Sequence, residues 1–201
     1  MAVWILIAAE HRLPRGSALL AHRVLAVIDQ GGSCVRQFNG LASVLDASTK
    51  SWRCKPIGFL PSDRLRVYDT AVDTHTSLPL HGARAGFMDL NQAIVRGDAA
   101  SLAGPLNESD LNSYLALVRR TLAVINALSP GPSGGSGLAY PFLGFGPNSN
   151  SAFSTLVAAM GLACPSLPRG AWLAPGIGRY LLPEREISLI ARSLTGRLSP
   201  S

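Results

Sequence analysis

Strand-like and helix-like segments occupy different parts of this 201-residue chain. Apolar, β-rich runs at 2–8, 21–29, 34–39 and 65–72 predict strands, whereas helical periodicity is strong only in the second half of the chain. The two middle runs are joined by residues 30–33, whose Gly-Gly pair is typical of a hairpin turn. Strands followed by helices, rather than an alternation of the two, predict an α+β fold in which a small antiparallel sheet packs against helices.

Three helices are predicted in the second half. The clearest begins after Asn107, whose side chain can cap the first turn, and it carries one continuous apolar face. A second helix begins within the Asn-Ser-Asn-Ser run at 148–151 and ends at Gly161. A short amphipathic helix covers 184–194.

The remaining segments predict loops. Residues 74–105 show no sustained periodicity, which indicates an irregular excursion with one helical turn near 90–95. Gly and Pro are concentrated at 130–137 and 167–183, which predicts a flexible break and a loop. The break is too short to separate two domains, so we expect a single α+β domain over 1–201.

The composition narrows the class of partner. Apolar residues make up 47% of the chain and charged residues 15%, which indicates a compact protein. The net charge of +6 suits an acidic protein partner, but the arginines are scattered and aromatic residues make up only 6%. Specific binding of nucleic acid is therefore not expected.

Targeting signals are weak. No apolar run reaches the roughly 18–20 residues of a membrane span, so none is expected. The apolar start of the chain is short and lacks the basic region of a signal peptide. We expect a cytoplasmic protein, or one that is exported without a standard signal.

The three cysteines, Cys34, Cys54 and Cys164, form no C-x-x-C pair. Neither a disulfide framework nor a metal site is expected, and the sequence indicates no cofactor. Cys54 stands between Arg53 and Lys55, whose charges would lower the pKa of its thiol, so it is the candidate for a reactive cysteine.

The polar run at 148–151 has two interpretations. Ser and Asn side chains cap helices by accepting hydrogen bonds from the first N–H groups, but one cap needs one such residue and four stand in a row. In the second interpretation Ser149 is a nucleophile at a helix N-terminus. The backbone N–H groups of Asn150 and Ser151 would then bind the oxyanion.

His22 is the candidate base for such a serine. It lies at the start of an apolar strand and shares a face with Val24 and Ile28. Imidazole suits general-base work near neutral pH, although a histidine on a core-facing strand is also a common structural residue. On the next strand Gln37 and Asn39 share a face, and either can orient the ring or be an ordinary polar residue.

The order of these residues resembles the circularly permuted papain-like superfamily, which includes lecithin retinol acyltransferase-like proteins and bacterial cell-wall and acyl hydrolases. The resemblance rests on two blocks, "AHRVLAVIDQGGSCVRQFNG" and "NSNSAF". Family members often carry Asn-Cys-x-x-Phe at the helix start, and here Ser149 stands at the cysteine position while Phe153 comes one residue later. The resemblance implies His22 as the base and Asn39 or Gln37 as the third polar group.

The resemblance further implies a hydrolase or acyltransferase that acts on an amide or ester bond of a peptide or acyl substrate. Apolar segments at 140–145 and 172–177 would line the cleft. Serine has a far higher pKa than cysteine and needs stronger activation. The alternative is a catalytically inactive binding or structural module on the same scaffold, in which the serines are caps.

The catalytic interpretation makes a geometric prediction. The imidazole of His22 and the hydroxyl of Ser149 should approach hydrogen-bond range, about 2.6–3.2 Å, or somewhat more without a ligand.

The same interpretation predicts that the cysteines are dispensable. Replacing all three with alanine should leave any hydrolysis of ester or amide substrates nearly intact, because the nucleophile is a hydroxyl. Loss of activity in Cys54→Ala alone, with an unchanged circular dichroism spectrum, would move the chemistry to a thiol.

Overall fold

The structure, a computed structural model, describes residues 2–12, 21–46, 48–49, 52–55, 58, 60–71, 78–80, 83–85, 90–128, 137–141, 146–167 and 174–195. An antiparallel sheet of seven strands forms its centre, with the order β8-β1-β2-β3-β5-β9 and with β4 also paired to β3. The strands of this sheet are β1 (Trp4–Arg12), β2 (Ala21–Ile28), β3 (Cys34–Leu45), β4 (Trp52–Lys55), β5 (Arg64–Ala71), β8 (Ala99–Leu106) and β9 (Leu138–Ala139). A separate antiparallel pair is formed by β6 (Leu78–Leu80) and β7 (Ala83–Ala85). The helices are α1 (Asn91–Arg96), α2 (Glu108–Ala127), α3 (Ser149–Ala159) and α4 (Glu184–Thr195).

The predicted α+β class is confirmed, and so is the hairpin between β2 and β3. Its turn is held by Asp29, whose carboxylate accepts hydrogen bonds from the N–H groups of Gly31 (2.9 Å) and Ser33 (2.8 Å). Gly32 has a φ of 81°, in the left-handed region where a side chain is disfavoured. A local polar side chain and a glycine thus make the turn that the sequence predicts.

The helical turn expected near 90–95 is found as α1, which covers 91–96. The expectation of irregular structure for the rest of 74–105 was wrong at 78–80, 83–85 and 99–106, which form β6, β7 and β8. The sequence of β8, AASLAGPL, is rich in small residues of low β-propensity. It becomes a strand because β1 offers it an edge, and an edge position tolerates Pro105.

Two other expectations fall mostly or partly outside the described residues. The flexible break expected at 130–137 lies outside them except for Gly137, and of the proline-rich loop expected at 167–183 residues 168–173 lie outside them. Its described part, 174–183, includes a turn at 175–178 before α4.

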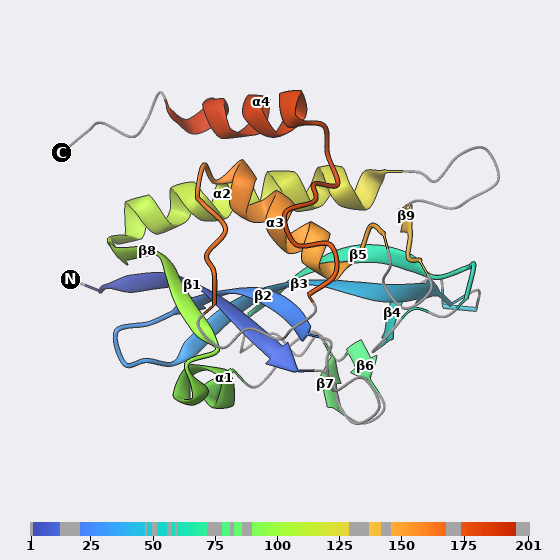
Figure 1. Cartoon of the computed structure of the whole chain (residues 1–201), viewed down its shortest axis with the longest axis horizontal. Coiled ribbons are helices and arrows are strands. Elements are labelled where there is room, and N and C mark those ends of the chain that lie inside the picture. The colour runs from blue at the N-terminus through green and yellow to red at the C-terminus, as the bar shows by residue number, and fades with distance from the viewer. Residues whose placement is uncertain are drawn as a thin grey trace.

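The sheet separates two apolar clusters (Figure 1). Alternate residues of β2 point to opposite faces, so Leu25 and Val27 pack under the helices whereas Val24 and Ala26 face the other way. On the helical side α2 and α3 lie on the sheet, and α4 packs on their outer side (Figure 1). On the opposite side Leu90 and Ala93 of the α1 region complete the smaller cluster.

The strands β2 and β3 pair over only part of their length. Their ladder runs from Leu25 to Ile28 on β2, and β4 joins β3 only from Ala42 onward. Between these two ladders Ala21–Val24 diverge from Asn39–Leu41, and we call these two segments the β2–β3 fork. The N-terminal turn of α3 lies against the fork, because a side chain on Gly40 would come within 2.8 Å of Ala152 Cβ and 3.1 Å of Ser149 Cα.

This close approach predicts that Gly40→Ala destabilises the fold. The added methyl group meets backbone and Cβ atoms of α3 that cannot rotate away, and overpacking of this kind costs about 1–3 kcal/mol. The free energy of unfolding in urea measures the effect. Gly31→Ala, whose new methyl group would meet only the Asp29 side chain, is the control and should cost much less. Equal effects of the two substitutions would contradict the seating of α3 on the fork.

Candidate functional site

The N-terminus of α3 is capped by Asn148, not by one of the serines. Asn148 has an extended backbone, and its Oδ1 accepts hydrogen bonds from the N–H groups of Asn150 (2.8 Å) and Ser151 (3.1 Å). Its Nδ2 donates to the carbonyl of Pro175 at 2.8 Å. One asparagine therefore satisfies two of the N–H groups that a helix start leaves open and also holds the following turn.

Asn150 connects α3 to the β2–β3 fork. Its Oδ1 accepts a hydrogen bond from the N–H of Arg23 (2.8 Å), and its Nδ2 donates to the carbonyl of Ala21 (3.0 Å). These are the backbone groups on either side of His22, at the place where β3 has diverged. A side-chain amide carries the same donor and acceptor as a peptide group, so Asn150 takes the place of a neighbouring strand.

The other polar side chains of α3 bind the turn at 175–181. Ser151 donates to the carbonyl of Gly176 (3.2 Å), Ser154 accepts from the N–H of Gly178 (3.0 Å), and Thr155 accepts from the N–H of Leu181 (2.8 Å). Gly176 has a φ of 88°, and a side chain there would come within 2.5 Å of Asn148 Oδ1. The polar residues of α3 thus replace backbone partners that this turn lacks.

Ser149 is the first residue of α3, and it lies beside Tyr140. Burial raises the pKa of Tyr140 above its ordinary value, and the hydroxyl and backbone N–H of Ser149 oppose that shift. Tyr140 also packs closely on the backbone of Gly58, which has no room for a side chain there.

His22, Asn39 and Gln37 form a chain of hydrogen bonds. The Nε2 of His22 lies 3.1 Å from Asn39 Oδ1, and Asn39 Nδ2 donates to Gln37 Oε1 at 3.1 Å. Because Asn39 uses its amino group on Gln37, its oxygen accepts the proton of Nε2, and the basic nitrogen of the ring is Nδ1. All three side chains are buried, with exposed fractions of 4%, 0% and 0%.

The predicted site is therefore brought together only in part. The His22 ring bonds to Asn39, and Gln37 reaches the ring only through Asn39. The hydrogen bonds found among the described residues do not include one between His22 and Ser149. His22 shares the strand face of Val24 and Ala26, whereas α3 covers the other face of the sheet. The predicted approach of imidazole and hydroxyl is not found, and the catalytic roles of Ser149 and His22 stay a prediction.

The predicted oxyanion hole is occupied by the protein itself. The N–H groups of Asn150 and Ser151 both donate to Asn148 Oδ1. Neither group can bind an oxyanion unless Asn148 moves away. The sequence predicted a helix start within 148–151 but did not distinguish Asn148 as its cap.

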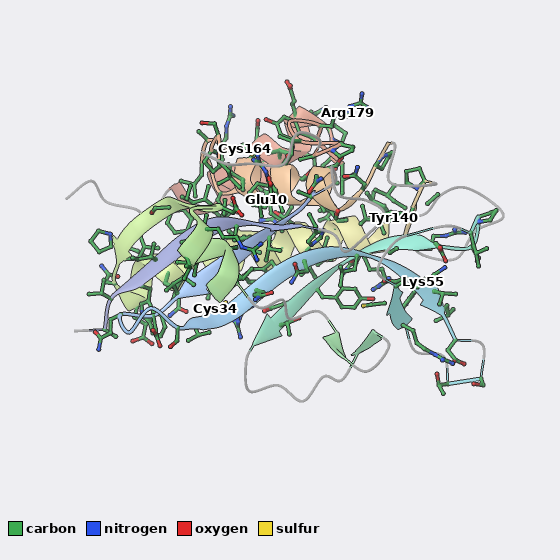
Figure 2. The ribbon with its side chains drawn as sticks, turned by 60° about the horizontal axis from the view of Figure 1, so that its bottom comes forward. Glu10, Cys34, Lys55, Tyr140, Cys164 and Arg179 are labelled. Atoms are coloured by element: carbon green, nitrogen blue, oxygen red, sulfur yellow. The ribbon has the colours of Figure 1, made fainter. Side chains whose placement is uncertain are left out.

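All three cysteines are free. Two of them, Cys34 and Cys164, are labelled in Figure 2. The neighbours expected to lower the pKa of the Cys54 thiol are engaged elsewhere, since Arg53 pairs with Asp46 and Lys55 with Asp63. Burial instead raises the pKa of Cys54 above its ordinary value. Within the described ranges no group of His, Cys, Asp and Glu could hold a metal ion.

The sequence did not predict that Ser43, Arg66 and Tyr68 come together on one face of the sheet. Ser43, Arg66 and Tyr68 lie on the face that carries Asn39, because Asn39 pairs with Tyr68 and Leu41 with Arg66. The hydroxyls of Ser43 and Tyr68 are 2.7 Å apart. The alternation of polar and apolar residues in 64–71 was the available signal, but it does not say which other strand lies opposite.

Comparison with known proteins gives no match, whether with family models, curated proteins or solved structures. In the described part of the chain no helix is both long and apolar enough to cross a membrane.

The geometry predicts that Asn148 contributes more to stability than an ordinary cap. Asn107 caps α2 through one hydrogen bond, from the N–H of Asp110 at 2.9 Å, and is exposed. Loss of such a cap costs about 0.5–2 kcal/mol. Asn148→Ala should cost at least about 1 kcal/mol more than Asn107→Ala, because it leaves two N–H groups of buried residues without their acceptor and removes one of the two donors to the carbonyl of Pro175. Urea denaturation of both variants checks this, and equal costs would contradict it.

Proposed function

We propose that this chain is a binding or structural module without catalytic activity, in which the polar start of α3 holds the fold together. The observation that carries this proposal is that Asn148 Oδ1 already accepts both N–H groups that an oxyanion would need. The neighbouring Asn150, Ser151, Ser154 and Thr155 likewise bind backbone groups of β2 and of the turn after α3.

Catalysis by Ser149 would need two arrangements that compete with these bonds. A serine nucleophile requires a base within hydrogen-bond reach, but the Ser149 hydroxyl lies beside Tyr140, and His22 shares the sheet face opposite the one that α3 covers. An oxyanion hole requires donors that are preorganised toward the developing charge, but these donors point at Asn148. Ser149 and His22 are also buried, at 8% and 4% exposure, so a substrate would have to displace side chains to reach them.

A hydrolase or acyltransferase of permuted papain-like form is the second candidate, and one observation favours it. The bonds from His22 to Asn39 and on to Gln37 fix the ring and leave Nδ1 as its basic atom, as a catalytic imidazole requires. Ser149 lies against Gly40, the residue next to Asn39. In this candidate His22 takes the proton of Ser149 as the hydroxyl attacks an amide or ester carbonyl.

Substitution of Ser149 separates the two candidates. We expect the purified protein to hydrolyse p-nitrophenyl esters no faster than the buffer and to resist labelling by a fluorophosphonate. Ser149→Gly and Ser149→Cys should then behave like the parent protein in both assays. Ser109→Gly, an exposed serine in the first turn of α2, is the matched control.

The opposite result, a Ser149-dependent hydrolase activity, is equally easy to recognise. Turnover that falls by several powers of ten in Ser149→Gly, survives in Ser149→Cys and is unchanged in Ser109→Gly would overturn the proposal and establish the enzyme. His22→Ala should then lose the same activity.

A further inference from the structure

We propose that Arg66, Tyr68 and Ser43 form a binding site for a carboxylate on the sheet face opposite α2 and α3. The inference rests on the proposed binding function and names a class of ligand for it. None of these residues belongs to the cluster at the start of α3.

The strand register brings the site together. Ser43 pairs with Cys54 of β4, Leu41 with Arg66 of β5, and Asn39 with Tyr68 of β5. Cross-strand partners point to the same face, so the side chains of these residues are neighbours on one surface. Arg66 and Tyr68 are only half-buried, so a ligand can reach them.

Arg66 is a cation whose hydrogen bonds are incomplete. Its guanidinium lies over the ring of Trp52, 4.6 Å from the ring centre, and its Nη1 is buried with no hydrogen-bond partner. A buried donor without an acceptor is costly, more so when it is charged. An acceptor with a negative charge at Nη1 would remove that cost.

The described carboxylates in or directly next to β3 and β5 are already paired with cations other than Arg66. Asp46 pairs with Arg53, and Asp63 pairs with Lys55 at 2.6 Å. Asp69 pairs with both Arg36 and Arg119. Among the described acidic side chains none is paired with Arg66, and we assign the missing charge to a ligand.

Neutral hydroxyl groups lie on the same face as the guanidinium. The hydroxyls of Tyr68 and Ser43 share one hydrogen bond of 2.7 Å, and the Ser43 hydroxyl donates a longer one of 3.3 Å to the carbonyl of Leu41. A charged carboxylate at Arg66 would compete with that carbonyl for the Ser43 hydrogen, because hydrogen bonds to ionised acceptors are stronger. Burial raises the pKa of Tyr68 and keeps its phenol protonated. The charge of Arg66 acts on the pKa of Tyr68 and of Cys54, which places all three groups within electrostatic range.

The composition of the site favours a carboxylate over a phosphate. One guanidinium balances one negative charge, and its planar fork matches the two oxygens of a carboxylate. The indole of Trp52 and the side chain of Leu41 on the same face suit an apolar group attached to that carboxylate. A fatty acid and the C-terminus of an apolar peptide share this chemistry.

Titration calorimetry with octanoate tests the site, with N-acetyl-Leu-Leu as the peptide probe. We expect saturable binding of at least one probe and at least tenfold weaker binding of octanamide, which lacks the charge. Arg66→Gln should weaken binding at least tenfold, and Arg66→Lys should weaken it less because it keeps the charge but not the fork. Arg53→Gln, on the neighbouring strand and already paired with Asp46, should bind like the parent protein.

A second variant and two further binding results can also contradict the proposal. If Arg66→Gln does not fold, Tyr68→Phe removes one hydroxyl with little change of shape and should weaken binding severalfold. Tighter binding of inorganic phosphate than of either carboxylate would overturn the ligand class. Equal affinity of octanoate for the Arg66 variants and the parent protein, or no binding at all, would overturn the site. Octanoate has no bond to hydrolyse, so these results are independent of the Ser149 assays.

Discussion

The arrangement of this protein depends on the contact between Asn150 and the β2–β3 fork. Antiparallel strands that diverge leave backbone donors and acceptors exposed at the point of separation, and such groups must find partners when they are buried. Asn150 supplies both partners through the N–H of Arg23 and the carbonyl of Ala21. The same amide reaches the carbonyl of Pro175, so one side chain joins the sheet, α3 and the turn that leads to α4.

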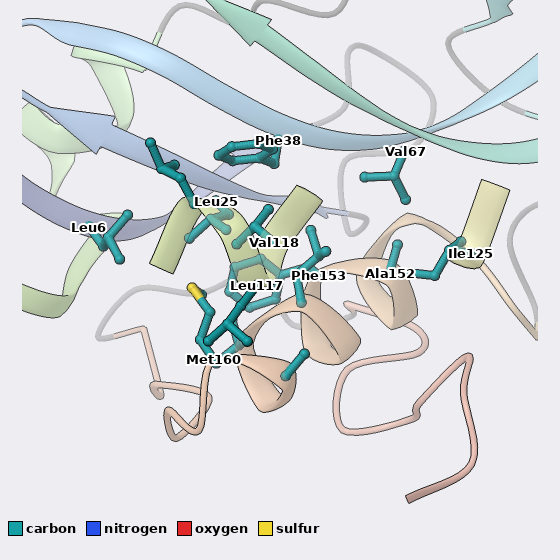
Figure 3. Packing of buried hydrophobic residues seen from close by; sticks show 14 of the residues in the cluster. Leu6, Leu25, Phe38, Val67, Leu117, Val118, Ile125, Ala152, Phe153 and Met160 are labelled. Carbon is teal, nitrogen blue, oxygen red and sulfur yellow. The ribbon is translucent and has the colours of Figure 1, made fainter. Parts of the chain in front are cut away.

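The second constraint is the lack of a side chain at Gly40. It lets the first turn of α3 approach β3 closely enough for the side chain of Asn150 to reach the β2–β3 fork. Phe153, Leu156 and Val157 then enter the main apolar cluster with Leu25 and Phe38 (Figure 3). Polar bonds at the start of the helix thus set the position at which its apolar part packs.

The two faces of the sheet differ in character. The helical face is apolar along most of its length, whereas the opposite face carries the buried chain from His22 to Gln37 and the group formed by Ser43, Arg66 and Tyr68. Buried polar groups on one face of a sheet need hydrogen-bond partners, which are either other groups of that face or a ligand. The imidazole chain satisfies itself through Asn39 and Gln37, and the guanidinium of Arg66 does not. This difference is why the ligand site is assigned to Arg66 and not to His22.

By itself the sequence determined the α+β class, the hairpin at 21–39 and the capped helix after Asn107. It offered Asn39 and Gln37 as alternative partners for His22, and in the structure the ring bonds Asn39 while Gln37 bonds Asn39. These features depend on local turn chemistry, periodicity and the pairing of neighbouring strands, which are all readable along the chain. Only the tertiary structure decided the strand at β8 and the roles of the four residues at 148–151. A strand of small residues forms because a partner edge is present, and equivalent polar residues become different when each meets a different backbone group. Those partners lie up to 129 positions away, as Asn150 does from Ala21, and no local pattern encodes such a distance.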